Sequence, residues 1–272
     1  MSAVIALVLA SGCGDPVHDR AVDALGGEKA GVAKGPLHRA GQPCLTCHAG
    51  QGPASYEMAF GGTVYAQQDI DAPGAGAVVR LLDSKNHTYD VNANCVGNFW
   101  VPRGAYDAVY PVTAVVTVQG FSRVMTTQMK REGSCADCHL DPASSASPGH
   151  LWAEPAGNDP PAAACTKDET PKGMAGTLPE CAMLTPKCAA PYPTYTKDVA
   201  PILAASCTGC HQAKGQNSNP SLTSYRLVSA LKTKVTANTL IAQCRMPPPP
   251  LDPLSDADRE TFSCWIAGGA KQ

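Results

Sequence analysis

Three short stretches of the chain share one pattern of two cysteines and a histidine. They read CLTCH, CADCH and CTGCH, so the cysteines are three residues apart and the histidine follows the second cysteine directly. With 13 Cys and 7 His in 272 residues, chance alone predicts about 0.016 copies. Three copies therefore indicate a shared chemical purpose. The residues concerned are Cys44, Cys47, His48, Cys135, Cys138, His139, Cys207, Cys210 and His211.

The position of the histidine separates the chemistries that use paired cysteines. A thioredoxin-like redox pair needs a surrounding βαβ pattern, and none is evident in this sequence. A zinc site usually takes four closely spaced ligands, without a histidine abutting the second cysteine. C-x-x-C-H is instead typical of covalent c-type haem attachment, with two thioether bonds and a proximal histidine. We expect three covalent haems with His48, His139 and His211 as proximal ligands.

Composition and charge narrow the class of protein. The chain has 25 Gly, 24 Pro and only 6% aromatic residues, which favours small, loop-rich modules over one large apolar core. A formal net charge of -2 gives no electrostatic basis for nucleic-acid binding. Thirteen cysteines indicate an oxidising compartment or a bound cofactor.

The first residues indicate export. The run AVIALVLASGCG is apolar but too short to span a bilayer, and is typical of the hydrophobic region of a signal peptide. Small residues leading into Cys13 resemble the lipobox of bacterial lipoproteins. That resemblance implies a lipidated Cys13, a membrane anchor and a periplasmic or cell-surface location. An ordinary cleaved signal and a retained segment are the alternatives.

The elements around the motifs predict an α+β multidomain protein. Short β-branched runs such as FGGTVYA, GAVVRLLDS and GNFWVP predict a small antiparallel β-sandwich over about residues 56–130, flanked by the first two motifs. This region resembles carboxypeptidase-regulatory or transthyretin-like sandwiches. Because chain ends of such sandwiches often meet, we expect the first two haems to lie close together. The expected division is 1–13 signal, 14–34 flexible tether, 35–152 diheme module, 153–191 Pro/Ala-rich linker and 192–272 helical monohaem domain.

The last region predicts helices around the third motif. YTKDVAPILAAS and LTSYRLVSALKTKV have helical spacing, and SDADRETFSCWIAGG opens with a capping pattern. The region resembles a class I cytochrome c domain. The resemblance implies Met246, in CRMPPPP, as the distal ligand of the third iron; packing against the haem edge is the alternative. We expect a Cys244–Cys264 disulfide, a pair among Cys165, Cys181 and Cys188, and the third of these bound to Cys95.

Distal ligands for the first two irons are less determined by the sequence. His38, six residues before Cys44, is the first candidate for the first iron. His150 is a further candidate ligand. Met125 and Met129, close before Cys135, are alternatives for the second iron, and His87 is a further candidate. His18 falls in the expected tether, where we expect it to be solvated.

The combined pattern resembles exported bacterial multihaem c-type cytochrome lipoproteins. It predicts a non-enzymatic electron carrier whose partners are redox proteins, such as other cytochromes or quinol-linked complexes. Two alternatives differ in class. One is a peroxidase-like haem enzyme with one open iron, and the other is a structural surface protein that forms oligomers or haem filaments.

Overall fold

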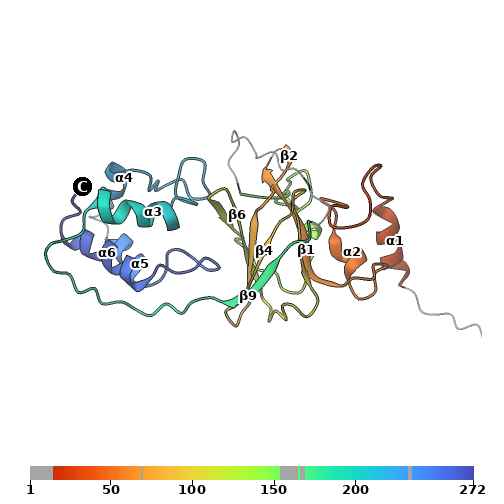
Figure 1. Cartoon of the computed structure of the whole chain (residues 1–272), viewed down its shortest axis with the longest axis horizontal. Helices are drawn as coiled ribbons and strands as arrows, with labels where there is room; N and C mark the ends of the chain where they lie inside the picture. Colours follow the sequence, from red (N-terminus) through yellow and green to blue (C-terminus); the bar gives the residue numbers. More distant parts are fainter. Residues whose placement is uncertain (1–14, 69, 154–164, 166–168, 232–234) are drawn as a thin grey trace, which may run out of the picture.

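The computed structural model describes residues 15–68, 70–153, 165, 169–231 and 235–272. The export signal and Cys13 lie outside these residues. Figure 1 shows an elongated molecule with strands at its centre and helices at both ends. One end holds α1 (Pro16–Ala24) and α2 (Cys44–His48), and the other holds α3 (Ala200–Ser206), α4 (Tyr225–Ser229), α5 (Val235–Ala242) and α6 (Asp256–Ala267). The expected α+β class is confirmed.

The strands form two sheets. The first has the order β2 (Ile70–Pro73), β1 (Met58–Gln67), β5 (Asn98–Pro102), with β8 (Leu151–Trp152) added in parallel to β1. The second is wholly antiparallel, in the order β7 (Phe121–Val124), β6 (Thr113–Val118), β3 (Val78–Leu82), β4 (His87–Asn92), β9 (Gly173–Thr177). The predicted β-branched runs therefore do form strands, and tight hairpins and loops connect them.

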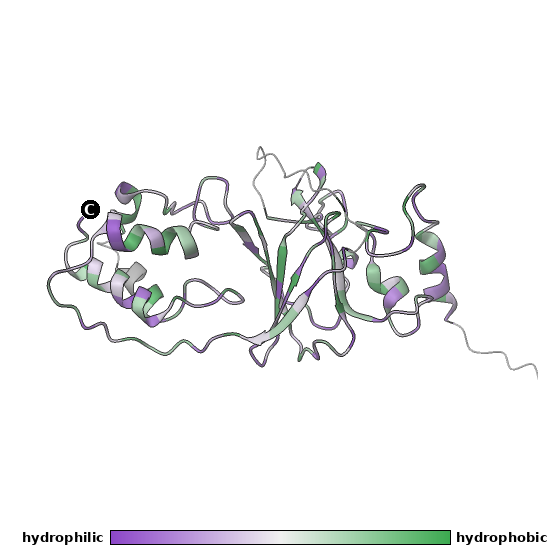
Figure 2. Ribbon diagram, in the orientation of Figure 1, coloured by the Kyte–Doolittle hydropathy of each residue, from purple (hydrophilic) through white to green (hydrophobic). Residues whose placement is uncertain are grey.

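One hydrophobic core lies between the two sheets. Phe60 and Val64 of β1 and Phe99 of β5 pack with Val79 and Leu81 of β3, and all five are almost fully buried. Burying each such side chain contributes roughly 1.5–3 kcal/mol. Figure 2 shows the apolar colouring concentrated on these central strands. Two sheets sharing a core in this way are what a two-layer sandwich requires.

Two segments differ from the sequence-based prediction. Residues 16–24 of the expected flexible tether form α1, whose first N–H groups, those of Val17 and His18, are capped by the Asp15 carboxylate at 3.0 and 3.2 Å. Part of the expected linker forms β9, which pairs antiparallel with β4. The sequence GMAGT gives no strand signal because all five residues are exposed, so only backbone pairing holds β9 in place.

The disulfides correct two expected pairings. Cys244 bonds Cys181 and Cys264 bonds Cys188, so the predicted Cys244–Cys264 bond is wrong. The predicted pair among Cys165, Cys181 and Cys188 is also wrong, because each of these three bonds a cysteine outside the group. Each of the two helical-domain cysteines is instead joined to the preceding linker. The bond between Cys95 and Cys165 agrees with the expectation that one linker cysteine reaches Cys95.

The C-terminal domain packs around Trp265, which is 1% exposed, with Phe262, Leu203 and Val228 against it. The predicted cap of α6 is confirmed, because the Ser255 hydroxyl accepts from the Asp258 N–H at 3.1 Å. A π-helical turn (Tyr195–Val199) precedes α3, and Pro201 lies in the first turn of α3, where its missing N–H is not needed. Helix α4 covers only part of the segment predicted to be helical.

Candidate functional site

The cysteines divide into two groups. Among the described residues, six cysteines form the three disulfides and six remain unpaired. The unpaired ones are those of the three motifs: Cys44, Cys47, Cys135, Cys138, Cys207 and Cys210. Because the remaining described cysteines are all oxidised, the motif cysteines are set apart in a chain suited to an oxidising compartment.

Each motif folds as a single helical turn. The first forms α2, the second begins with the 3-10 turn Cys135–Asp137, and the third forms a hydrogen-bonded turn after α3. In the second and third motifs the backbone N–H of the histidine donates to the carbonyl of the first cysteine at 2.9 Å. The turn therefore brings both cysteines and the histidine to neighbouring positions, as a group bound by all three requires.

The three motif histidines make the same hydrogen bond. Their Nδ1 atoms lie 2.7, 2.8 and 2.9 Å from backbone carbonyl oxygens that follow 8, 10 and 9 residues later. A carbonyl can only accept, so Nδ1 must carry the proton and Nε2 keeps a free lone pair. This is how proteins fix a metal-binding imidazole. The pairs are His48–Tyr56, His139–Gly149 and His211–Pro220.

After each motif the chain turns back, so that the later carbonyl reaches the histidine. A sequence signal for this turn lies four residues after the histidine. Gly52 and Gly215 occupy that position in the first and third motifs. A Cβ atom at either glycine would collide with the carbonyl oxygen of the second motif cysteine, Cys47 or Cys210. The glycines allow the chain to turn back tightly, and so the C-x-x-C-H pattern extends to C-x-x-C-H-x-x-x-G in two of its copies.

Burial disfavours the thiolate form of the first cysteine in each motif. Desolvation raises the pKa of Cys44 to about 11, of Cys135 to about 12 and of Cys207 to about 11. Redox-active and metal-binding cysteines need a lowered pKa, because the thiolate is the reacting form. Uncharged sulfur at these three positions is compatible with a thioether.

The first motif opens on a cavity of about 320 Å³. Its wall combines Cys44, Cys47, His48 and His38 with mostly apolar side chains, among them Leu25, Met58, Phe99 and Trp100. The His38 and His48 rings are 13° from parallel with centroids 5.9 Å apart, too far for direct ring contact. Two imidazoles on opposite faces of one iron, each at about 2 Å, have centroids about 6 Å apart.

The surroundings of His38 favour the form of its ring that can bind a metal. Burial lowers the pKa of His38, which favours the neutral imidazole that a metal binds. In the structure the Gly35 N–H donates to its Nδ1 at 3.0 Å. Ligation through Nε2 places the proton on Nδ1, so this bond must be exchanged for one in which Nδ1 donates.

The second motif also faces a cavity of about 320 Å³, whose wall includes Cys135, His139, Tyr65 and His150. Burial is the main cause of a lowered pKa at His139. His150 lies near it and is 6% exposed, but both of its ring nitrogens have partners. Nδ1 is 2.5 Å from Asp141 and Nε2 is 2.7 Å from the Gln67 carbonyl oxygen. Iron ligation by His150 would require one of these bonds to be replaced.

The remaining candidate ligands are dispersed. Met129 packs against the core between the sheets, and His87 is exposed and paired with Asp83 at 3.1 Å. Met246 lies in the loop between α5 and α6 and is 36% exposed. The expectation that His18 is solvated is wrong for its Nε2 atom, which is buried in α1 without a hydrogen-bond partner among the described residues.

The first two motifs pack against two consecutive glycines of β1. A Cβ atom at Gly61 would lie 2.9 Å from the Cβ of Cys44, and one at Gly62 would lie 2.8 Å from the Cβ of Cys135. The motifs, 91 residues apart at their first cysteines (135 − 44), therefore contact adjacent residues of one strand. This close approach requires glycine at both positions and supports the expectation that the first two motifs lie together.

Replacing Gly62 with alanine is expected to lower the free energy of unfolding by about 1–3 kcal/mol, because the added methyl overpacks against Cys135 and Phe99. Guanidinium unfolding followed by circular dichroism measures the change. The matched control is Gly27→Ala, where a Cβ meets nothing within 4 Å. Equal stability of the two variants would contradict the close approach.

The third motif docks on β7, at the far end of the second sheet. The Ser122 N–H donates to the Gly209 carbonyl at 3.1 Å, and the Cys210 thiol donates back to the Ser122 carbonyl at 3.1 Å. Gln216 adds two bonds of 2.8 Å to the backbone of Val124. Beside this contact the Arg123 guanidinium lies 3.3 Å from the centre of the Trp152 ring, so β8 is in contact with β7 next to the third motif.

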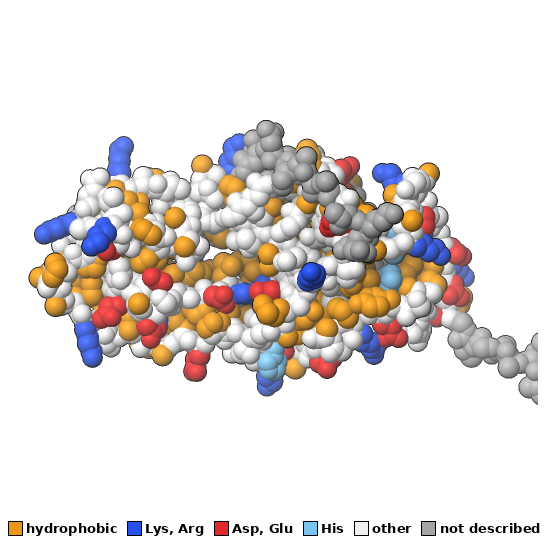
Figure 3. All heavy atoms as spheres, viewed as in Figure 1, with side chains coloured by type: hydrophobic (Ala, Val, Ile, Leu, Met, Phe, Trp, Pro, Cys, Tyr) orange, Lys and Arg blue, Asp and Glu red, His pale blue; other side chains and the backbone are white. Residues whose placement is uncertain are grey.

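The face drawn in Figure 3 gives few indications of a charged partner. In Figure 3 the acidic and basic side chains are interspersed on the face shown, with apolar side chains between them. Within the described residues, no helix combines the length and the hydropathy needed to cross a bilayer.

Comparisons with known proteins identify no relative of this chain. Neither the protein-family models, nor the curated proteins, nor the solved structures contain a match to this chain.

Proposed function

We propose that the chain is an exported electron-transfer protein that carries three covalently attached c-type haems. The main support for the proposal is that the three motifs share two structural features. In each, two cysteines stay out of the disulfides, and the histidine donates Nδ1–H to a backbone carbonyl, so that Nε2 is free. Burial raises the pKa of Cys44, Cys135 and Cys207, which favours uncharged sulfur and agrees with a thioether.

Each motif supplies two sulfurs and an imidazole for a haem. A bound haem exchanges one electron at its iron while the protein supplies ligands, spacing and a low dielectric. Cys44 and Cys47 would hold the first haem, with His48 and His38 as its axial ligands in the apolar cavity. Cys135 and Cys138 with His139 would hold the second. Cys207 and Cys210 with His211 would hold the third, and Met246 is its proposed distal ligand by the cytochrome c resemblance.

The packing of the three motifs supports an order for the proposed haems. The first two motifs share β1, and the third lies against β7 beside the Arg123–Trp152 stack. We infer a β-sandwich that spaces three haems, with a small cytochrome c-like domain at its far end. Electrons would pass between the first and second haems and leave or enter through the third, toward a weakly docking redox protein.

The first residues of the chain and the disulfides support a proposal for its location and anchoring. Three disulfides fit an oxidising compartment, which is also where c-type haems are attached. We propose a periplasmic or cell-surface protein tethered through a lipid on Cys13.

A redox titration of the haem-loaded protein tests this function. We expect reversible uptake of three electrons per chain, and no rapid reaction of the reduced first haem with carbon monoxide, because His38 closes that iron. His38→Ala should open one site and bind about one carbon monoxide more per chain than the wild type. The matched control is His87→Ala, an exposed histidine that lines neither cavity, which should behave as the wild type does.

The result also separates the alternative functions. Rapid turnover of peroxide by the wild-type protein would favour a haem enzyme with an open iron. Reversible electron uptake combined with large assemblies in size-exclusion chromatography would favour a haem filament. A chain without bound haem would overturn the proposal altogether.

A further inference from the structure

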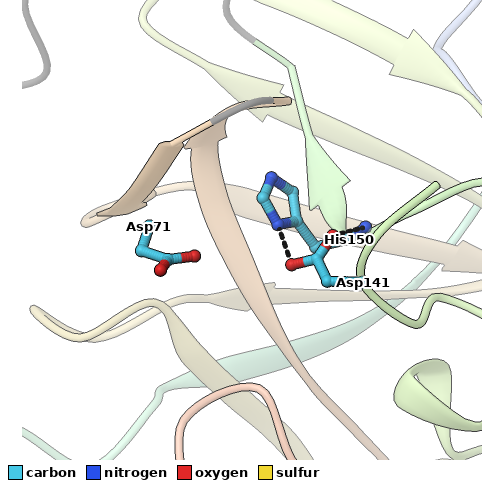
Figure 4. Close-up of side chains that lie close together, drawn as sticks. All are labelled: Asp71, Asp141 and His150. Atoms are coloured by element: carbon cyan, nitrogen blue, oxygen red, sulfur yellow. Dashed lines mark hydrogen bonds and ion pairs between the residues drawn. The ribbon is translucent and has the colours of Figure 1, made fainter.

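Three side chains with metal-binding groups converge beside the second motif, from three separate segments. Asp71 belongs to β2, Asp141 to the loop after His139, and His150 immediately precedes β8. One ligand atom from each lies within 4.8 Å of those of the other two. Figure 4 shows the Asp71 carboxylate turned toward the pair formed by Asp141 and His150. None of the three belongs to a C-x-x-C-H motif.

The His150 ring is held in one orientation. It is almost fully buried and stacks on Tyr65, with ring centroids 4.2 Å apart and planes 18° from parallel. Its Nε2 lies 2.7 Å from the Gln67 carbonyl oxygen, which can only accept, so Nε2 carries a proton. Nδ1 is thereby directed at the two carboxylates. A hydrogen bond from the second ring nitrogen to a carbonyl is the usual support of a metal-binding histidine.

Two carboxylates face a single imidazole nitrogen at this point. Nδ1 of His150 is 2.5 Å from an oxygen of Asp141, and either a shared proton or a metal ion can occupy the space between the two lone pairs. A proton on Nδ1 would compensate one carboxylate only. Asp71 takes part in no ion pair found among the described residues. The pKa of the adjacent Tyr65 is raised, mainly by burial and further by the charges of Asp71 and Asp141.

The geometry points to a binding site for one divalent metal ion of the zinc class, with His150 Nδ1 and a carboxylate oxygen from each of Asp71 and Asp141 as ligands. One divalent ion with two carboxylates and a neutral imidazole is electrically neutral. Imidazole with carboxylates suits zinc and its first-row neighbours, whereas calcium prefers oxygen alone. Tetrahedral ligands at about 2.1 Å are about 3.4 Å apart, so Asp141 must move outward, and its exposure allows this.

An ion at this point would act on the second motif through the backbone. It would tie β2 to the loop of residues 140–150. That loop carries Gly149, whose carbonyl accepts the Nδ1 proton of His139 at 2.8 Å. Metal binding is therefore expected to stiffen the segment that orients a motif histidine, without contacting the motif itself.

Calorimetric titration with Zn²⁺ tests the site in the purified, chelator-treated protein. The haem-loaded form is used, with any free motif thiols alkylated, because unoccupied motifs would themselves bind zinc. We expect one strong site per chain, and slower amide hydrogen exchange in residues 140–150 after zinc addition. Asp71→Asn should weaken binding at least tenfold, because it removes a ligand and leaves the Asp141–His150 contact intact. Asp107→Asn, an exposed aspartate outside the cluster, is the matched control and should leave binding unchanged.

The outcomes are distinguishable from those that bear on haem binding. Haem content is measured on the same samples, so a failure of the electron-transfer proposal leaves the zinc result readable. Absence of a strong site in the wild type, or equal affinity in the wild type and Asp71→Asn, would show that His150 and Asp141 form only a hydrogen-bonded pair.

Discussion

Replacing both cysteines of any one motif with serine is expected to remove one of three covalently bound haems. The reason is local, because each motif supplies its own two sulfurs and its own histidine in one turn. Cys44→Ser/Cys47→Ser, Cys135→Ser/Cys138→Ser and Cys207→Ser/Cys210→Ser should each lower haem absorbance per chain by about one third. The measurement is the pyridine haemochrome spectrum of protein exported from a host that attaches c-type haem.

The control uses cysteines from a disulfide. Cys95→Ser/Cys165→Ser removes two cysteines as well, but they are already bonded to each other, so three haems should remain. If all four variants carried the same amount of haem as the wild type, covalent attachment at the motifs would be disproved. Six free thiols in the mature wild-type protein would disprove it equally.

Removing the Cys188–Cys264 disulfide should destabilise the C-terminal domain by about 4 kcal/mol. The bond closes a chain separation of 76 residues, and the loss of that loop constraint increases the entropy of the unfolded chain. Cys264 lies in α6, one residue before the buried Trp265, so the bond ties the preceding linker to the core of this domain. Guanidinium unfolding of Cys188→Ser/Cys264→Ser, followed by near-ultraviolet circular dichroism, measures the loss.

Two comparisons make this result specific. Cys181→Ser/Cys244→Ser removes a bond of similar separation, 63 residues, and should cost a similar amount. Cys95→Ser/Cys165→Ser lies in the other part of the chain and should leave the C-terminal transition where it is. A C-terminal transition that stays unchanged in Cys188→Ser/Cys264→Ser would mean that α6 is held by packing alone.

The sequence by itself determined features that depend on near neighbours. The motif spacing identifies nine residues and predicts the chemistry that unites them. Alternating β-branched residues predict β1, β3, β4, β5 and β6, because burial on one face of a strand repeats every second residue. Ser255 predicts the start of α6, because a cap bonds to an N–H only three residues away.

Tertiary structure decided whatever depends on residues far apart in the chain. Which linker cysteine bonds Cys264 follows from the path of the chain around the C-terminal domain, and no local pattern encodes that path. The strand β9 has no burial pattern of its own and is held only by backbone bonds to β4. The carbonyl partners of the motif histidines likewise appear only once the loops have folded back.

The same distinction holds at the candidate site. Sequence proximity suggested His38 for the first motif, and folding brings its ring nearly parallel to His48. His150 was a candidate for the same chemistry, but Asp141 and the Gln67 carbonyl take both of its nitrogens. The local sequence gives no reason for glycine at positions 61 and 62 of the strand. The reason appears only in the folded chain, where two distant motifs pack against Gly61 and Gly62. A side chain's type limits what it can bind, whereas the distances to its neighbours decide what it does bind.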